Sequence, residues 1–150
     1  IWAYAKQHFD HVSAERLLSG AGLALIHAAL TQNKEPEVQA LSAKDIVTLA
    51  LEGNHPLCCR SLAVFSAMLG SFAGDVALTL GARGGVYVCG GMVPRFIEAF
   101  QQSSFRTRFE SKGRCKSYLA AIPVYVVLNP CTGLLGAAVA LQQTLDAETN

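Results

Sequence analysis

The stretch Gly84-Gly85-Val86-Tyr87-Val88-Cys89-Gly90-Gly91-Met92-Val93-Pro94-Arg95-Phe96 decides the fold, because two glycine pairs bracket an uncharged run of β-branched and aromatic residues. The run at 86–89 predicts a strand buried on both faces. Gly90-Gly91 predicts a sharp turn that lets the backbone approach a ligand, and Pro94 suits the first turn of a helix. A positive φ at Gly91 would strain any larger residue there. Since α/β proteins bind nucleotides beyond the carboxyl ends of their strands, the pair fits a ligand-binding turn as well as a plain tight turn.

The composition indicates one compact domain with a surplus of apolar surface. Of the 150 residues, 51% are apolar even without glycine, and only 15% are charged. Ordinary domains have about 45–50% apolar residues with glycine included and about 25% charged residues. A missing lobe, a second copy of the chain or an unusually rich interior would cover the surplus. The first residue is Ile1 and not Met, so we expect a fragment of a longer protein.

Charge argues against two classes of function. The formal net charge is +1. The basic residues that gather in one region are Arg106, Arg108, Lys112, Arg114 and Lys116. Glu110 lies among them and few aromatic residues do, so they predict a solvated surface and disfavour nucleic-acid binding. The uncharged stretch from 117 to 145 is interrupted by Pro123 and by Asn129-Pro130, which leaves pieces shorter than a membrane-spanning helix needs.

Cysteine and histidine spacing predicts no metal site. The five cysteines are an odd number without a C-x-x-C pair, which is typical of reduced, buried thiols in a cytosolic protein. His8 and His11 could share one helix face, but Asp10 is the only further ligand type nearby. A zinc site normally needs three or four protein ligands, so we interpret both histidines as structural or exposed.

Periodicity and capping residues predict a mostly helical chain with strands in its second half. Ser13 is expected to cap one helix, and Ser42 with Asp45 resembles a capping box for another. The expected helices cover 1–9, 14–18, 22–31, 43–52, 57–80, 94–101 and 134–145, and a second strand covers 124–128. The stretch 102–123 is expected to be irregular, and 32–40 is the nearest approach to a linker. Strand and helix alternate, which favours parallel pairing, with the remaining strands upstream of Ile1.

The helix expected at 57–80 has two apolar stripes, which predicts a buried central helix. The large residues are Phe65, Met68, Leu69, Phe72 and Val76. The small residues are Ser66, Gly70, Ala73, Ala77 and Gly81. The small stripe would let a neighbouring element approach closely, since glycine in a helix otherwise costs about 1 kcal/mol relative to alanine.

Four segments together resemble the carboxyl-terminal half of proteobacterial-type glucokinases. They are 10–20 (DHVSAERLLSG), 84–96, 122–126 (IPVYV) and 133–136 (GLLG). The resemblance implies an α/β fold, namely a partial RNase-H-like lobe of the actin-like ATPase superfamily, helix-rich with few parallel strands. It implies that 1–128 form most of the second, large lobe, without its amino-terminal strands. It also implies that 129–150 form a terminal helix that returns to the first lobe.

The function implied by this resemblance is transfer of a phosphoryl group from MgATP to the 6-hydroxyl of D-glucose in a cytoplasmic homodimer. Glu15 matches the glutamate that accepts hydrogen bonds from sugar hydroxyls, a task suited to an acceptor-only carboxylate. On the residues alone, the favoured interpretation is that Glu15 complements the dipole of the helix that Ser13 caps, and the resemblance reverses that preference. Gly90, Gly91 and Met92 match the turn beneath the adenosine. Residues 130–132 (PCT) depart from the Asp-Asn-Pro that the family often has there.

No catalytic residue is expected within this sequence. It contains no Asp-x-Gly-Gly-Thr-Asn phosphate loop, no Asn-Asp pair with a general base and no Glu-Gly-Gly-His sugar segment. The resemblance places all three upstream of Ile1, in the missing amino-terminal lobe, so the isolated chain is expected to be inactive. A non-catalytic sugar- or nucleotide-sensing module of the same superfamily is the alternative, and a dimerisation domain is a third reading.

Overall fold

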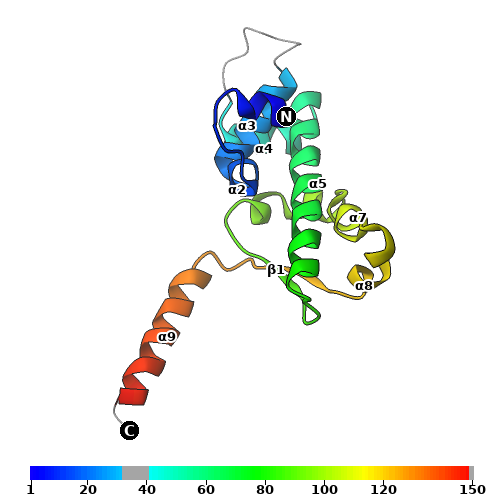
Figure 1. The fold of residues 1–150 in the computed structure, drawn as a ribbon. Helices are drawn as coiled ribbons and strands as arrows, with labels where there is room; N and C mark the ends of the chain where they lie inside the picture. The colour runs from blue at the N-terminus through cyan, green and yellow to red at the C-terminus, as the bar shows by residue number, and fades with distance from the viewer. Residues whose placement is uncertain (32–40, 149–150) are drawn as a thin grey trace.

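The computed structural model describes residues 1–31 and 41–148 as a helix-rich α/β fold (Figure 1). Its helices are α1 (Trp2–Lys6), α2 (Ala14–Leu17), α3 (Gly20–Thr31), α4 (Ala43–Leu51), α5 (Pro56–Thr79), α6 (Ile97–Gln101), α7 (Phe105–Glu110), α8 (Lys116–Ala120) and α9 (Thr132–Glu148). Its strands are β1 (Val86–Val88) and β2 (Val124–Val126), and 3-10 turns cover Val93–Phe96 and Gly113–Cys115. The linker expected at 32–40 lies outside the described residues. The fold class expected from the sequence is confirmed.

Two helices begin at the serines that the sequence predicts as caps. Ser13 accepts a hydrogen bond from the Arg16 N–H at 3.3 Å, and Ser42 accepts one from the Asp45 N–H at 3.2 Å. The box at Ser42 closes differently from the usual one, because the Ser42 hydroxyl donates to the Asp45 carboxylate at 2.6 Å. The Asp side chain is one methylene shorter than Glu, so its carboxylate bonds the serine side chain where Glu would reach the backbone N–H.

Helix α5 is the central element, and its stripe of small residues is the buried one. Ser66, Gly70 and Ala73 are buried, whereas Phe72 on the large stripe is 45% exposed. The physical reason is the close approach of α7, because a Cβ on Gly70 would overlap the carbonyl oxygen of Phe105. The prediction of a buried central helix is thus confirmed, but the large stripe is exposed toward its carboxyl end. Gly81, expected on the small stripe, lies beyond α5 with a φ of 60° and ends the helix.

The stretch expected to be irregular contains α7, a 3-10 turn and α8. Phe105 and Phe109 are four residues apart on one face of α7, and both are buried. Their rings continue a row of aromatic contacts that begins at Phe65 and passes through Phe96 and Phe100, with ring centroids 4.7–6.4 Å apart. An isolated six-residue helix is marginal in water, so this burial is what stabilises α7.

The basic residues of this region are not all solvated, contrary to the sequence prediction. The Lys112 ammonium lies 2.7 Å from the Asp75 carboxylate and donates to the Ser71 hydroxyl at 3.2 Å, which ties the chain after α7 to α5. Arg106 forms an ion pair with Glu110. Arg108, two residues further along α7, is exposed. The difference arises because Arg106 and Lys112 face polar groups on neighbouring elements, which the sequence pattern does not reveal.

The two strands of the described residues are paired in parallel, as predicted. The register joins Val86 to Val124, Tyr87 to Tyr125 and Val88 to Val126. The valines pack against the core, whereas Tyr87 and Tyr125 are 64% and 47% exposed on the other face. The prediction of a strand buried on both faces is therefore wrong for the described chain. The two tyrosine rings stack at 5.0 Å and shield each other where a covering layer would otherwise lie.

The cysteines differ in burial from the sequence prediction. Each of the five cysteines, all within the described ranges, is a free thiol. Only Cys58 is buried, so the prediction of buried thiols is wrong for the other four. Burial raises the pKa of the Cys58 thiol, and the adjacent Cys59 adds to the rise.

Helix α5 is long and apolar enough to cross a membrane, a property that it shares with core helices, and it packs on α3, α4 and α7.

The close packing of α7 on α5 makes Gly70 intolerant of a side chain. Gly70→Ala is expected to lower the free energy of unfolding by about 1–3 kcal/mol, because the new methyl group overpacks the contact with Phe105. Gly136→Ala is the matched control, since Gly136 lies within α9 with nothing near its Cβ position. It is expected to leave the free energy of unfolding of the packed core near the parental value, because the described side chains of α9 are exposed along its length. Urea denaturation of the 150-residue chain measures both; a stabilising Gly70→Ala would contradict the packing.

Candidate functional site

The turn after β1 places two glycines where no side chain blocks the surrounding space. Gly90 has a φ of 122°, a conformation that favours glycine. Gly91 is not among the residues with positive φ, so the strain considered for Gly91 belongs to Gly90 instead. A Cβ added at either position would have no heavy atom within 4 Å. The turn is therefore open on the side where its missing side chains would point.

A cavity of about 370 Å³ lies beside this turn. One wall consists of 89–91 with Pro94 and Arg95, and the other consists of 127–130 with Thr132 and Gly133. Each wall follows the carboxyl end of a strand, because β1 ends at Val88 and β2 ends at Val126. Parallel strands end at the same edge of a sheet, which is where α/β folds bind ligands.

The second wall is held by a local turn that leads into α9. The Asn129 side-chain oxygen accepts a hydrogen bond from the Cys131 N–H at 2.9 Å. The Thr132 hydroxyl donates to the Asn129 carbonyl at 2.8 Å. These bonds place the first turn of α9 against the cavity, and the amino terminus of a helix favours negatively charged groups.

Met92 does not line this cavity, although the sequence groups it with the glycine pair. Its sulfur lies 3.6 Å from the Cβ position of Gly20, at the start of α3. A smaller cavity of about 130 Å³ separates the turn from Leu18, Phe65 and Leu69. Met92 therefore packs behind the glycine turn and connects it to the chain that leaves α2.

Glu15 is exposed in the first turn of α2, the helix that Ser13 caps. The two ion pairs of the described residues do not include Glu15. Its neighbour Arg16 places its guanidinium 4.6 Å from the centroid of the Phe9 ring. Neither cavity beside the glycine pair is lined by Glu15. The structure thus places Glu15 and the glycine turn apart from each other. They are connected through Met92, which lies near the start of α3.

The histidines considered as metal ligands are exposed on the surface. His8 contacts the Tyr4 carbonyl oxygen through Nδ1 at 3.0 Å, and His11 is exposed. Within 1–31 and 41–148, no three His, Cys, Asp or Glu side chains gather in a group that could hold a metal ion. A metal bound beside these residues would need ligands from elsewhere.

Sequence reasoning left a nucleotide contact at 130–133 in doubt, because 130–132 depart from the family pattern, and it missed the residue that contacts the chain before β2. The signal for the wall was available, because parallel pairing brings the turn at Asn129-Pro130 to the same edge as Gly90-Gly91. The signal for Arg106 was not, because its partners Leu119, Ala120 and Ile122 contribute backbone carbonyls that no motif records.

These features define a class of protein: the described residues form a partial lobe of the actin-like ATPase type, helix-rich with parallel strands and an open cavity at their carboxyl ends. A protein-family profile described as Glucokinase matches residues 1–144. The chain belongs to the glucokinase family.

Individual relatives agree with the family. The chain is 55% identical over 145 residues to a glucokinase of Neisseria meningitidis, covering 97% of this chain and 44% of the relative. It is 53% identical over 151 residues to a glucokinase of Helicobacter pylori, covering 97% and 45%. A crystal structure of glucokinase from an Antarctic psychrotroph superimposes with a TM-score of 0.84 at 34% identity, covering 95% of this chain and 44% of that one. The chain therefore spans less than half the length of these relatives.

Proposed function

We propose that this chain is the carboxyl-terminal part of an ATP-dependent glucokinase, whose reaction transfers a phosphoryl group from ATP to the 6-hydroxyl of D-glucose. The observation that carries the proposal is the open cavity between the glycine turn and the first turn of α9, in a chain 55% identical to a glucokinase over 97% of its length. A sugar- or nucleotide-sensing regulator could share this lobe, and the activity of the full-length parent distinguishes the two.

The cavity is proposed to hold the adenosine of ATP. Gly90 and Gly91 would let the nucleotide lie against bare backbone, because neither position carries a Cβ. Thr132 and Gly133 would face it from the start of α9, where helix N–H groups attract negative charge. Met92 would support the turn from behind through its contact with Gly20.

Glu15 is proposed to bind the sugar. An ionised carboxylate only accepts hydrogen bonds, and its two oxygens can take two neighbouring hydroxyls of glucose. Glu15 is exposed and takes part in neither ion pair of the described residues, so its oxygens are accessible to a ligand. Ser13 caps its helix and so orients the first turn.

The phosphate loop and the general base are proposed to come from the rest of the parent, since this sequence contains neither motif. The described residues contain no group of three His, Cys, Asp or Glu side chains that could hold a metal ion, and we propose that Mg²⁺ is held mainly by the phosphates and by the remainder of the enzyme. The metal would neutralise charge on the transferred group.

Residues 1–128 are proposed as most of the large lobe, and 129–150 as the helix that returns to the other lobe. The exposed apolar side chains of α9 support this division, because they need a covering surface; they are Leu134, Leu135, Val139, Leu141 and Leu145. We propose a cytoplasmic homodimer as the parent, with the free thiols in keeping with a reducing compartment.

The isolated 150-residue chain is expected to show no glucokinase activity, because it lacks a general base that typically contributes 10²–10⁴-fold and lacks the phosphate loop. A coupled assay for glucose-dependent ADP formation measures this against a protein-free blank, with the full-length parent as the positive control. Turnover by the isolated chain would refute the proposed division of labour. An inactive parent that still binds glucose or ATP would favour the sensing module.

Replacing Glu15 by Gln in the parent is expected to weaken glucose binding by roughly 10- to 150-fold, the equivalent of one hydrogen bond to a charged group. Asp45→Asn is the matched control, because Asp45 occupies the first turn of α4 behind a serine cap, as Glu15 does in α2. This substitution removes an acidic partner of a helix dipole at a position where no sugar contact is proposed. Titration calorimetry with glucose compares them, and equal affinities in both variants would return Glu15 to a helix-dipole role.

Valine at Gly91 is expected to reduce ATP affinity in the parent by roughly 5- to 150-fold, because overpacking against a ligand costs about 1–3 kcal/mol. Its melting temperature should stay near that of the parent, since nothing lies within 4 Å of the Cβ position. Gly90→Val serves as the comparison and should lower the melting temperature, because Gly90 has a φ of 122°. Unchanged ATP affinity in Gly91→Val would remove the nucleotide from this turn.

A further inference from the structure

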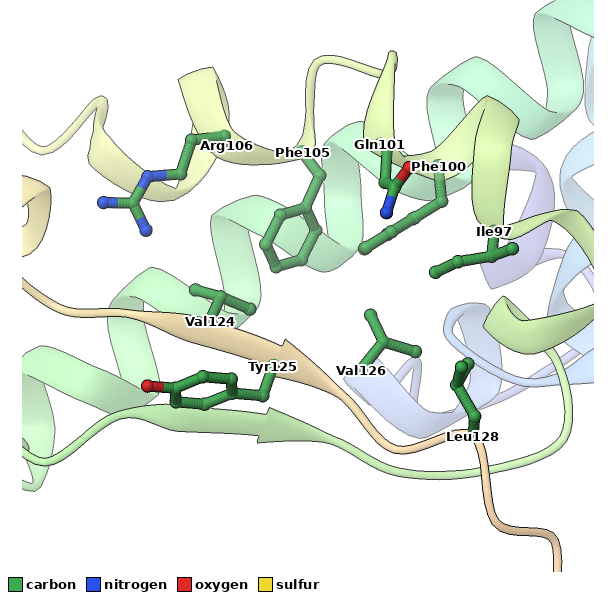
Figure 2. Close-up of a pocket in the computed structure, with 9 residues that line it drawn as sticks. All are labelled: Ile97, Phe100, Gln101, Phe105, Arg106, Val124, Tyr125, Val126 and Leu128. Atoms are coloured by element: carbon green, nitrogen blue, oxygen red, sulfur yellow. The ribbon is translucent and has the colours of Figure 1, made fainter.

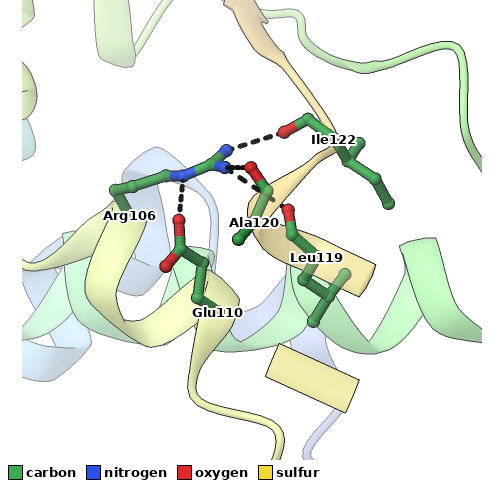
Figure 3. A network of polar contacts seen from close by, with 5 residues as sticks. All are labelled: Arg106, Glu110, Leu119, Ala120 and Ile122. Carbon is green, nitrogen blue, oxygen red and sulfur yellow. Dashed lines mark hydrogen bonds and ion pairs between the residues drawn. The ribbon is translucent and has the colours of Figure 1, made fainter. Parts of the chain in front are cut away.

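Arg106 joins three consecutive elements through one guanidinium group (Figure 3). Its Nε donates to Glu110 within α7, at a spacing of four residues. One terminal nitrogen donates to the Ile122 carbonyl at 2.8 Å. The other donates to the carbonyls of Ala120 at 2.8 Å and Leu119 at 3.3 Å. The side chain thus connects α7 to the carboxyl end of α8 and to the residue two positions before β2.

Arg106 adds to the bonding of the carbonyls at the end of α8, where the Leu119 oxygen also accepts from the Ile122 N–H at 3.0 Å. The last carbonyls of a helix have no partner within it, and they form the negative end of the helix dipole. A planar guanidinium can bind several such oxygens at fixed angles, which a lysine ammonium cannot. The Arg106 guanidinium also lies 5.2 Å from the centroid of the Phe109 ring, which limits its movement. Arg106 therefore defines where the chain leaves α8 and starts β2.

The packing between β2 and the helices α6 and α7 is incomplete. A cavity of about 380 Å³ separates Val124 and Val126 from Ile97, Phe100 and Phe105 on α6 and α7. Figure 2 shows these side chains facing one another across the cavity, with Arg106 at one end. Because this packing is incomplete, the position of β2 depends also on its pairing with β1, on the buried Ile122 and on the bonds of Arg106 just before the strand.

The position of β2 in turn determines the second wall of the candidate nucleotide cavity. Residues 127–130 follow β2 directly and line that wall, opposite Gly90 and Gly91. The Val127 N–H donates to the Val88 carbonyl at 3.0 Å, so the last rung of the sheet lies at the edge of the cavity. A shift of β2 along its axis would move 127–130 relative to the glycine turn and would change the width of the cavity.

We propose that Arg106 is a positioning residue for nucleotide binding: its guanidinium sets the placement of β2 and thereby the distance between the two walls of the cavity. This inference rests on the proposed function for its ligand, ATP. It assigns no contact between Arg106 and the nucleotide. This role also accounts for the bonds that Arg106 donates to backbone carbonyls, although the sequence predicts a solvated side chain there.

The test uses the full-length parent with Arg106→Met and Arg106→Lys. Lys112→Met is the matched control. The Lys112 side chain, just after α7, also bonds a neighbouring element, but that element is α5 and not the chain before β2. Arg106→Met is expected to raise the KM for ATP by roughly 2- to 30-fold, the range in which substitutions that act through coupled contacts alter a distant site. The KM for glucose should stay at the parental value. Arg106→Lys should give an intermediate KM for ATP, and Lys112→Met should lower the melting temperature without changing either KM.

Amide hydrogen exchange supplies a readout that does not need turnover. Peptides covering 124–133 should exchange faster in Arg106→Met than in Lys112→Met, with the peptides of α5 as the internal reference. If Arg106→Met does not yield folded protein, Arg106→Lys carries the same comparison. The proposal would be overturned if Arg106→Met changed the KM for ATP and the KM for glucose equally, in step with the melting temperature. Amide exchange at 124–133 as slow as in the parent would also overturn it. A parent that fails to phosphorylate glucose refutes the proposed function, while exchange and ATP titration still decide the role of Arg106.

Discussion

The close approach of α7 to α5 is the constraint on which the rest of the fold depends. Gly70 and Gly74 leave room for the backbone carbonyls of Phe105 and Phe109, which no side chain on α5 would permit. With the backbones this close, both phenylalanine rings lie in the core, and α7 becomes stable although it is only six residues long. The same contact fixes the orientation of α7, and Arg106, beside the buried face, extends toward α8 and the start of β2 (Figure 3).

The candidate site lies at the end of this series of contacts. Arg106 holds the chain before β2, β2 pairs in parallel with β1, and the two segments after the strands form the walls of the cavity. On the other side, Met92 packs on the start of α3, which follows the helix that carries Glu15. The two regions expected to bind ligands are thus connected through packed residues, although they line different surfaces of the described chain.

The surplus of apolar residues seen in the composition has a visible location. Tyr87 and Tyr125 are exposed on the outer face of the sheet, Phe72 and Leu80 are exposed on or just beyond α5, and the described side chains of α9 are exposed along its length. Helix α9 extends away from the other elements (Figure 1). Exposed apolar patches of this kind mark surfaces that bind another part of a protein or another molecule, in keeping with a chain that spans about 44% of its relatives.

Sequence by itself determined what depends on neighbouring residues. Ser13 and Ser42 cap helices because a serine side chain reaches its own N3 amide, and the period of α5 and the parallel pairing of the strands follow from local patterns. Only the tertiary structure decided which stripe of α5 is buried and that the basic stretch forms α7 and α8. It also decided that Gly90 and not Gly91 has the positive φ, and that Arg106 binds the Ile122 carbonyl. The burial of the stripe and the bonds of Arg106 depend on backbone carbonyls distant in sequence, which every residue type carries and no sequence pattern distinguishes.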